Sequence, residues 1–412
     1  MKILHFADLH LGMENYGKLD PATGLNSRLS DFLSSFDFLI ETAIKEKVDL
    51  VVFAGDAFKT REPSPTYQRA FAERIKKLSE AEIPTFLLVG NHDIPNISTK
   101  ADTLSIYDTL SIPNVYVASR PELLSIETKS SPCQIIALPS VTRSHVLAKE
   151  DTKGKSIEEI NQLIGEKILH VLDDFISKLD PEKASLIACH ATVSNAKFGA
   201  ERNVMLGSDI VLPLGSLANP KINYVALGHI HKHQVLSENP PVIYAGSIER
   251  VDFGEEKEDK GFVLAELAAG FKPAAKKRSW EFIKTPARKF LTIEVELKEN
   301  SLNPSNEIVN EITKHDVKEK IVKLKVNLPR SLNELINLAE IKASLKDAAQ
   351  FAGLQKVFDE QEREKSLAHQ ATVELLPLEA LGNYLKVKKV SPARSNKIQE
   401  KAKRLIEEIG EK

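Results

Sequence analysis

The stretch Ala226-Leu227-Gly228-His229-Ile230-His231 decides the fold, because it is the last of five short motifs of one chemical character. The four before it are Asp8-Leu9-His10, Gly55-Asp56, Gly90-Asn91-His92-Asp93 and Cys189-His190-Ala191. Their recurring side chains are Asp, Asn and His, which are ligands of divalent metal ions. Each motif alone is a weak signal, but all five in this order predict a single metal-binding site.

The motifs follow short apolar runs of the kind that form buried strands. The runs that end at or beside a motif are 2–7, 49–54, 84–89, 185–189 and 224–227, and a further run lies at 242–245. Apolar residues at helical spacing predict helices over 27–46, 64–82 and 156–178. This alternation of strand, motif and helix predicts an α/β fold whose loops carry the chemistry.

Changes of composition divide the chain. The five motifs lie within residues 1–265, which we expect to form the first domain. Residues 266–289 are rich in Ala, Gly, Pro and Lys, which predicts an exposed basic hairpin or linker. Residues 290–370 contain two segments of alternating apolar and polar residues and a predicted helix over 331–349. They are expected to form a small α+β domain.

Residues 376–412 are expected to form a helix-loop-helix with an apolar stripe. The stripe residues predicted to contact a partner are Leu378, Leu381 and Leu385 in the first helix and Ile398, Leu405 and Ile409 in the second. A helix pair of about 35 residues has little core of its own, so the stripe predicts a docking surface for another protein. Packing of the pair against its own chain is the alternative.

Composition favours a cytoplasmic protein. The chain of 412 residues has a net charge of −2, which is not typical of a nucleic-acid-binding protein. Its only cysteines are Cys133 and Cys189, which predicts a reducing compartment and no disulfide framework. The longest apolar runs have the length of strands, and the N-terminus does not read as a signal peptide, so no membrane association is expected.

The ligand types indicate phosphodiester chemistry. Asp8 and His10 are two apart, so an extended chain would place both side chains on one face, and His229 and His231 repeat this spacing. Phosphodiester hydrolysis is served by two metal ions about 4 Å apart. A carboxylate must bridge them, and Asp56 after its glycine is the natural candidate. The mixed oxygen and nitrogen donors favour two manganese ions, with iron or magnesium as alternatives.

The motif set resembles the calcineurin-like metallophosphoesterase superfamily and, within it, is similar to the SbcD nucleases. The narrower resemblance rests on Phe58, Pro63-Ser64-Pro65, Tyr244-Ala245-Gly246-Ser247-Ile248-Glu249-Arg250, Asp252-Phe253-Gly254-Glu255 and Asp259-Lys260-Gly261-Phe262. It is strong over about 1–265 and looser beyond. It implies a two-sheet sandwich flanked by helices, followed by an α+β capping domain over 290–370 and a partner-binding helix pair over 376–412.

The resemblance also implies residue roles. One metal would be held by Asp8, His10, Asp56 and His231, and the other by Asp56, Asn91, His190 and His229. His92 would then be free of metal and would protonate the leaving oxygen, with Asp93 setting its tautomer and orientation. Lys59 stands where some relatives carry a further histidine, which removes a second non-ligand imidazole from the expected site.

The function implied by the resemblance is a manganese-dependent DNA nuclease. It would act as a 3′→5′ exonuclease on duplex ends and as an endonuclease on single strands and hairpins. The protein would be a homodimer, with dimer contacts within 60–112, bound to SbcC-type ATPases. One alternative is a stand-alone phosphoesterase acting on small phosphodiesters or nucleotides. Another is a non-catalytic scaffold that tethers an ATPase to DNA.

Overall fold

A computed structural model describes most of the chain. The described residues are 1–95, 100–141, 154–199, 210–268, 270, 279–358, 378, 381–382, 384–385 and 390–410, without the side chains of 393, 405 and 407–410. The chain divides into two compact units. The first comprises Met1–Glu294, Ile308–Lys325 and Asn337–Gln355, and the second Val295–Glu307, Val326–Ile336 and Lys356–Lys412.

The first unit contains a six-stranded mixed sheet. Its strands, in spatial order, are β14 (Trp280–Lys284), β13 (Gly261–Glu266), β1 (Lys2–Phe6), β2 (Leu50–Phe53), β3 (Thr85–Leu88) and β4 (Val115–Ala118). Strands β1 to β4 are parallel, whereas β13 and β14 run antiparallel to their neighbours. The carboxyl ends of β1, β2 and β3 therefore meet at one edge of this sheet.

A second six-stranded sheet has a similar plan. Its strands, in spatial order, are β11 (Gln234–Glu238), β12 (Pro241–Tyr244), β10 (Tyr224–Gly228), β7 (Ala184–His190), β6 (Cys133–Leu138) and β5 (Glu122–Ile126). The four central strands are parallel and the two edge strands are antiparallel. Strands buried on both faces read as continuous apolar runs, which is why these segments were recognisable in the sequence.

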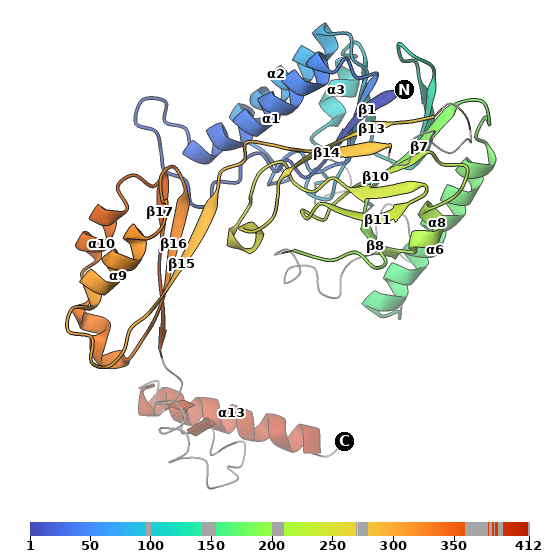
Figure 1. The fold of residues 1–412 in the computed structure, drawn as a ribbon. Coiled ribbons are helices and arrows are strands. Elements are labelled where there is room, and N and C mark those ends of the chain that lie inside the picture. Colours follow the sequence, from blue (N-terminus) through green and yellow to red (C-terminus); the bar gives the residue numbers. More distant parts are fainter. Residues whose placement is uncertain are drawn as a thin grey trace. The chain divides into compact units, whose positions relative to one another are not determined.

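The two sheets pack face to face with helices outside them (Figure 1). One buried cluster lies between the sheets and includes Ile3 and Val52 from the first and Leu186 and Ala226 from the second. A second cluster joins the first sheet to α1 (Ser27–Lys45) and α2 (Pro65–Glu80). A third joins the second sheet to α6 (Ile157–Ser177). The predicted two-sheet sandwich flanked by helices is confirmed.

Short elements complete the first unit's sandwich: α3 (Ser105–Thr109), α8 (Leu214–Leu217), the 3-10 turn η1 (Phe253–Glu255) and the paired strands β8 (Thr192–Val193) and β9 (Val211–Leu212). Because β14 pairs with β13, the first sheet continues beyond the predicted boundary at 265. The segment predicted as a hairpin or linker thus contributes a strand to the sandwich, where Trp280 is buried.

The α+β region contains a three-stranded sheet, in the order β15 (Phe290–Glu296), β16 (Ile321–Leu328) and β17 (Gln350–Phe358). Its helices are α9 (Pro304–Thr313), the 3-10 segment η2 (Arg330–Leu335) and α10 (Leu338–Ser344). The single helix predicted over 331–349 is therefore wrong. The Asn337 side chain accepts a hydrogen bond from the Ala339 backbone and begins a new helix at that point.

The C-terminal region contains helix α13 (Pro392–Gly410) and helical backbone at residues 378, 381–382 and 384–385. A side chain at Gly382 would lie 3.1 Å from the Gln399 amide of α13, so the two helical segments are adjacent. Leu385 is buried, whereas Ile406 is 40% exposed. The side chains of Leu405 and Ile409 lie outside the described residues. No helix in the described ranges is long and apolar enough to cross a bilayer.

Candidate metal centre

The five motifs meet at one edge of the sandwich. Asp8, Asp56 and Asn91 follow the carboxyl ends of β1, β2 and β3 in the first sheet. His190 is the last residue of β7, and His229 follows β10 in the second sheet. The His229 backbone N–H donates to Asp8 Oδ1 over 2.9 Å and joins the two sheets directly. The site is therefore formed where parallel strands of both sheets end.

Left-handed backbone conformations aim the side chains. The φ angles of Asp8, His10, Asp56 and His229 are 52°, 46°, 64° and 98°, a region that residues other than glycine rarely adopt. The extended geometry predicted for the Asp8–His10 pair is thus wrong, since left-handed bends at both residues bring their side chains together. His229 and His231 contact different residues, Asn91 and His10, so this pair does not act as one unit either. Such strain costs roughly 1–3 kcal/mol per residue and tends to occur at functional sites.

Glycines allow the strand ends to approach closely. A side chain at Gly90 would lie 2.2 Å from Asp56 Oδ1, and one at Gly228 would lie 2.2 Å from the Ala54 carbonyl oxygen. Gly55 has a φ of 99°, and a side chain there would lie 2.4 Å from His190 Nδ1. Any larger residue would clash at these three positions, so glycine is required directly before Asp56, Asn91 and His229.

One group of ligand-type atoms surrounds Asn91. Its Oδ1 lies 3.0 Å from His190 Nε2 and 3.0 Å from His229 Nδ1. His190 Nε2 also lies 3.4 Å from Asp56 Oδ2. The opposite ring nitrogen of His190 donates to the Ala54 carbonyl over 2.7 Å, which directs Nε2 into the group.

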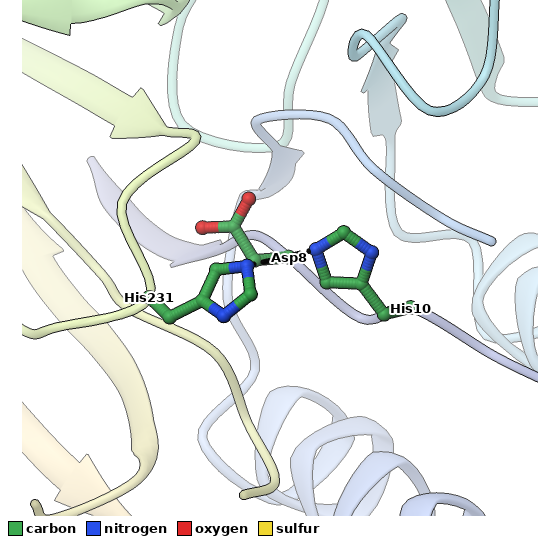
Figure 2. A group of neighbouring side chains, drawn as sticks. All are labelled: Asp8, His10 and His231. Carbon is green, nitrogen blue, oxygen red and sulfur yellow. Dashed lines mark hydrogen bonds between the residues drawn. The ribbon is translucent and has the colours of Figure 1, made fainter. Parts of the chain in front are cut away.

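A second group contains Asp8, His10 and His231. The Nε2 atoms of His10 and His231 face each other at 3.0 Å beside the Asp8 carboxylate (Figure 2). Candidate ligand atoms of these three residues all lie within 4.8 Å of one another. His10 Nε2 is also 3.6 Å from Asp56 Oδ2, the same oxygen that approaches His190. Asp56 thus lies between the two groups.

Glu255 holds His231 in place, a role that sequence reasoning missed. Its Oε1 accepts a hydrogen bond of 2.8 Å from His231 Nδ1, and its Oε2 lies 2.9 Å from Lys260 Nζ. Burial would raise the pKa of Glu255, but Lys260 and His231 outweigh it and hold the pKa at about 2. Glu255 lies in a run of acidic residues, which is typical of an exposed segment, so the sequence gives no sign that its side chain is buried.

The His92 ring is oriented by the Lys59 backbone and not, as expected, by Asp93. His92 Nδ1 donates to the Lys59 carbonyl over 2.8 Å, so that carbonyl orients the ring. The Asp93 carboxylate instead accepts backbone N–H groups of Gly90, Asp56 and Ala57 at 3.0–3.3 Å. The prediction that Asp93 orients His92 is therefore wrong. Asp93 holds the two motif loops together, because a buried carboxylate needs several donors.

The electrostatics favour a cation. Burial would lower the pKa of His190, but the carboxylates of Asp56 and Asp8 outweigh it and raise the pKa to about 9. Burial raises the pKa of Asp8, whereas His190 and His10 overcome burial and hold the pKa of Asp56 well below its usual range. The negative potential that stabilises a proton on His190 also attracts a metal ion.

The residues present fit a metal centre. Asp8 Oδ2 is buried and has no hydrogen-bond partner among the described residues, although a buried carboxylate oxygen without a partner is costly. The fixed ring orientations of His190 and His231 direct Nε2 of each toward the remaining ligand-type atoms. Oxygen and nitrogen donors in two groups that share Asp56 match the ligand chemistry of two divalent ions.

Two ligand groups that share an aspartate at the edge of an α/β sandwich define the chain as a metal-dependent phosphoesterase. The family model described as Calcineurin-like phosphoesterase matches residues 1–233. The chain belongs to this family, whose members depend on two metal ions. The resemblance inferred from the five motifs is confirmed.

Similar proteins include nucleases. The chain is 30% identical over 271 residues to the D component of the nuclease SbcCD from Staphylococcus epidermidis, covering 65% of this chain and 66% of that protein. It is 25% identical to the Bacillus subtilis protein of the same name, covering 89% and 88%. It is 26% identical to the DNA double-strand break repair protein Mre11 of Archaeoglobus fulgidus, covering 72% and 62%. The chain thus spans slightly less than two-thirds of the first and third relatives.

Replacing Glu255 with glutamine is expected to weaken metal binding. The new amide would face the Lys260 ammonium, so the ring of His231 would lose its fixed orientation. Loss of such a supporting partner typically lowers metal affinity about 10–100-fold. Titration calorimetry of metal-free protein with manganese measures the change. Glu281→Gln on β14, an exposed position, is the matched control. Unchanged affinity in Glu255→Gln would show that Glu255 only stabilises the fold.

Proposed function

We propose that this protein is a manganese-dependent DNA nuclease that hydrolyses phosphodiesters with two metal ions. It acts as a 3′→5′ exonuclease on duplex ends and as an endonuclease on single strands and hairpins. The observation that carries the proposal is the position of Asp56 Oδ2, which lies 3.6 Å from His10 Nε2 and 3.4 Å from His190 Nε2. One carboxylate oxygen thus faces both ligand groups, as a bridging ligand must.

We propose the two ligand sets that the resemblance implies. Asp8, His10, Asp56 and His231 would hold one ion, and Asp56, Asn91, His190 and His229 the other. When bound, the ions activate the attacking water and neutralise charge on the scissile phosphate. The buried side chains of Asp8, His10 and Asp56 keep competing water from the ligand atoms. Asn91, His92 and His231 are only partly buried, so the substrate approaches from their side.

His92 is the proposed general acid. Its Nδ1 is occupied by the Lys59 carbonyl and its backbone N–H donates to Asp56 Oδ1 over 2.8 Å. The ring is therefore fixed beside the bridging carboxylate, with Nε2 left to carry the proton. From there it donates to the leaving oxygen or to the phosphate.

Two features favour DNA over a small phosphodiester. The similar proteins named above are nucleases and a DNA double-strand break repair protein. In addition, a hollow of about 560 Å³ beside His92 is lined by Lys59 and Arg61, and by Lys100 in an ion pair with Glu62. Cationic side chains at this place suit the phosphates that flank a scissile bond.

Digestion of end-labelled DNA tests the proposal. Duplex and hairpin substrates are incubated with the protein and manganese, with and without an SbcC-type ATPase, beside a 4-nitrophenyl phosphodiester. Cleavage of DNA with manganese and none with chelator is expected. Hydrolysis of the small diester with intact DNA would favour the stand-alone phosphoesterase instead. Two bound ions with neither activity would favour the non-catalytic scaffold.

We further propose a homodimer bound to an SbcC-type ATPase through the C-terminal helix pair. Leu385 is buried, and a side chain at Gly382 would lie 3.1 Å from the Gln399 amide, so the two helical segments are adjacent. Ile406 remains 40% exposed and is available to a partner. The dimer contact is proposed within residues 60–112, where Ile106 and Leu110 of the α3 region are exposed.

Ile406→Asp is expected to abolish stable association with the ATPase while nuclease activity on short single strands is retained. A charge at this position would remain unpaired in an apolar interface. Co-elution of the two purified proteins on a sizing column measures association. Leu302→Asp, at a position that is 98% exposed, is the matched control. Retained co-elution of Ile406→Asp would place the partner site elsewhere.

A further inference from the structure

A cavity of about 370 Å³ opens beside the metal centre. One end is lined by Asn91, His190 and His229, which form the second ligand group, together with His92. The other end reaches between the second sheet and α6. The cavity is therefore continuous with the place where the scissile phosphate must lie, and its volume falls within the usual range for small-molecule sites.

The far end of the cavity is apolar and is formed by buried residues of the core. Ile164 and Ile168 project into it from α6, and Leu138 and Leu212 line it from the ends of β6 and β9. All four are at least nine-tenths buried and belong to the cluster that joins the second sheet to α6. These walls are part of the core, so the cavity does not depend on a surface side chain taking one particular position.

The α6 side of the cavity carries one amide, and Ser140 and Thr192 add hydroxyl groups elsewhere in the lining. Asn161 lies on α6, one helical turn before Ile164, and lines the same cavity. Among the described residues no hydrogen bond is formed by its side chain, although it is only partly exposed. An amide offers both a donor and an acceptor, so it can pair with a ligand edge that presents both.

We propose that this cavity binds the base of the nucleotide joined to the scissile phosphate. A nucleobase has flat apolar faces and an edge of donors and acceptors, which match the isoleucine walls and the Asn161 amide. Pockets for bases removed from the stack use apolar walls and edge hydrogen bonds in the same way. The proposal rests on the proposed function and deepens it. The base holds the strand while the phosphate lies at the metal centre.

The test compares two diesters with the same leaving group, thymidine 5′-(4-nitrophenyl) phosphate and methyl 4-nitrophenyl phosphate. The manganese-loaded protein is expected to prefer the thymidine ester by about tenfold or more in kcat/KM, the scale of base contacts in other proteins. Asn161→Leu and Ile168→Trp are expected to reduce this preference mainly by raising KM. Both should leave kcat/KM for the methyl ester unchanged, which also shows that the metal centre is intact.

Asn310→Leu, at an exposed position of α9, is the matched control and should behave as the native protein. The proposal would be overturned if the native protein showed no preference for the thymidine ester, or if the variants lost activity on both esters equally.

A parallel assay with an oligonucleotide tests whether the bound base belongs to a DNA strand or to a free nucleotide. An abasic residue at the cleaved position should slow the native protein and leave Asn161→Leu unaffected. If the variants affect the thymidine ester but not DNA, the cavity binds free nucleotides and the strand assignment is overturned. A native protein that cleaves the esters but no DNA would instead contradict the nuclease function.

Discussion

Asp56→Ala is expected to lose both metal ions and all measurable hydrolysis. Its Oδ2 faces His10 and His190 in the two ligand groups, and its Oδ1 accepts the backbone N–H of His92. Asp56 is the proposed ligand of both ions, so each would lose a ligand at once. Elemental analysis of purified protein after manganese loading measures the ions bound. Two retained ions would remove the bridging assignment.

Two further variants test whether the loss of metal in Asp56→Ala comes from its bridging position. His10 belongs to one ligand group only, so His10→Ala is expected to lose one ion and to regain part of its activity at millimolar manganese. Asp259→Ala removes an aspartate from an exposed ion pair with Lys284 and should retain two ions. If Asp259→Ala also lost its metal, the loss in Asp56→Ala would reflect general destabilisation.

His92→Ala is expected to retain both ions and to bind DNA, while turnover falls by roughly 10²–10⁴, the usual contribution of general acid catalysis. The His92 ring is held by the Lys59 carbonyl and meets the His10 ring edge-on at 4.9 Å between centroids. The variant keeps the backbone N–H that donates to Asp56, so the bridging carboxylate stays in place. Metal content and single-turnover rates are measured together.

A loss of metal in His92→Ala would contradict the assignment. Candidate ligand atoms of His10, Asp56 and His92 also lie within 4.8 Å of one another, so ligation by His92 is the geometric alternative. His92→Gln separates the two roles further. Glutamine offers a ligand oxygen but is not an acid, so it would restore metal in the alternative and would not restore turnover in the proposed role.

The sequence was sufficient to predict the α/β fold, because strands buried on both faces leave continuous apolar runs such as Leu50–Phe53. The two-sheet sandwich was implied by the family resemblance. Helix α1 was equally visible, since Phe32, Phe36 and Leu39 recur on one face. The candidate ligands could be recognised because each motif follows a predicted strand. Asn337, which interrupts the helix predicted over 331–349, was missed because a polar residue within an amphipathic pattern gives a weak local signal.

The geometry of the site could not be read from spacing. Asp8 and His10 meet through left-handed bends at both residues, and local sequence does not specify such strained angles. Tertiary contacts decided the roles of Asp93, which binds backbone groups of two loops, and of Glu255, which holds His231 from a segment 24 residues away. Hydrogen bonds between distant segments leave no periodicity in the sequence, so only the structure identifies these partners.

Anomalous diffraction at the manganese edge, from crystals of the manganese-loaded protein, tests the two-metal centre most directly. We expect two peaks about 4 Å apart. Asp56 should bridge them, His10 and His231 should bind one ion, His190 and His229 should bind the other, and His92 should bind neither. A single peak, or a peak bound by His92, would contradict the proposed centre.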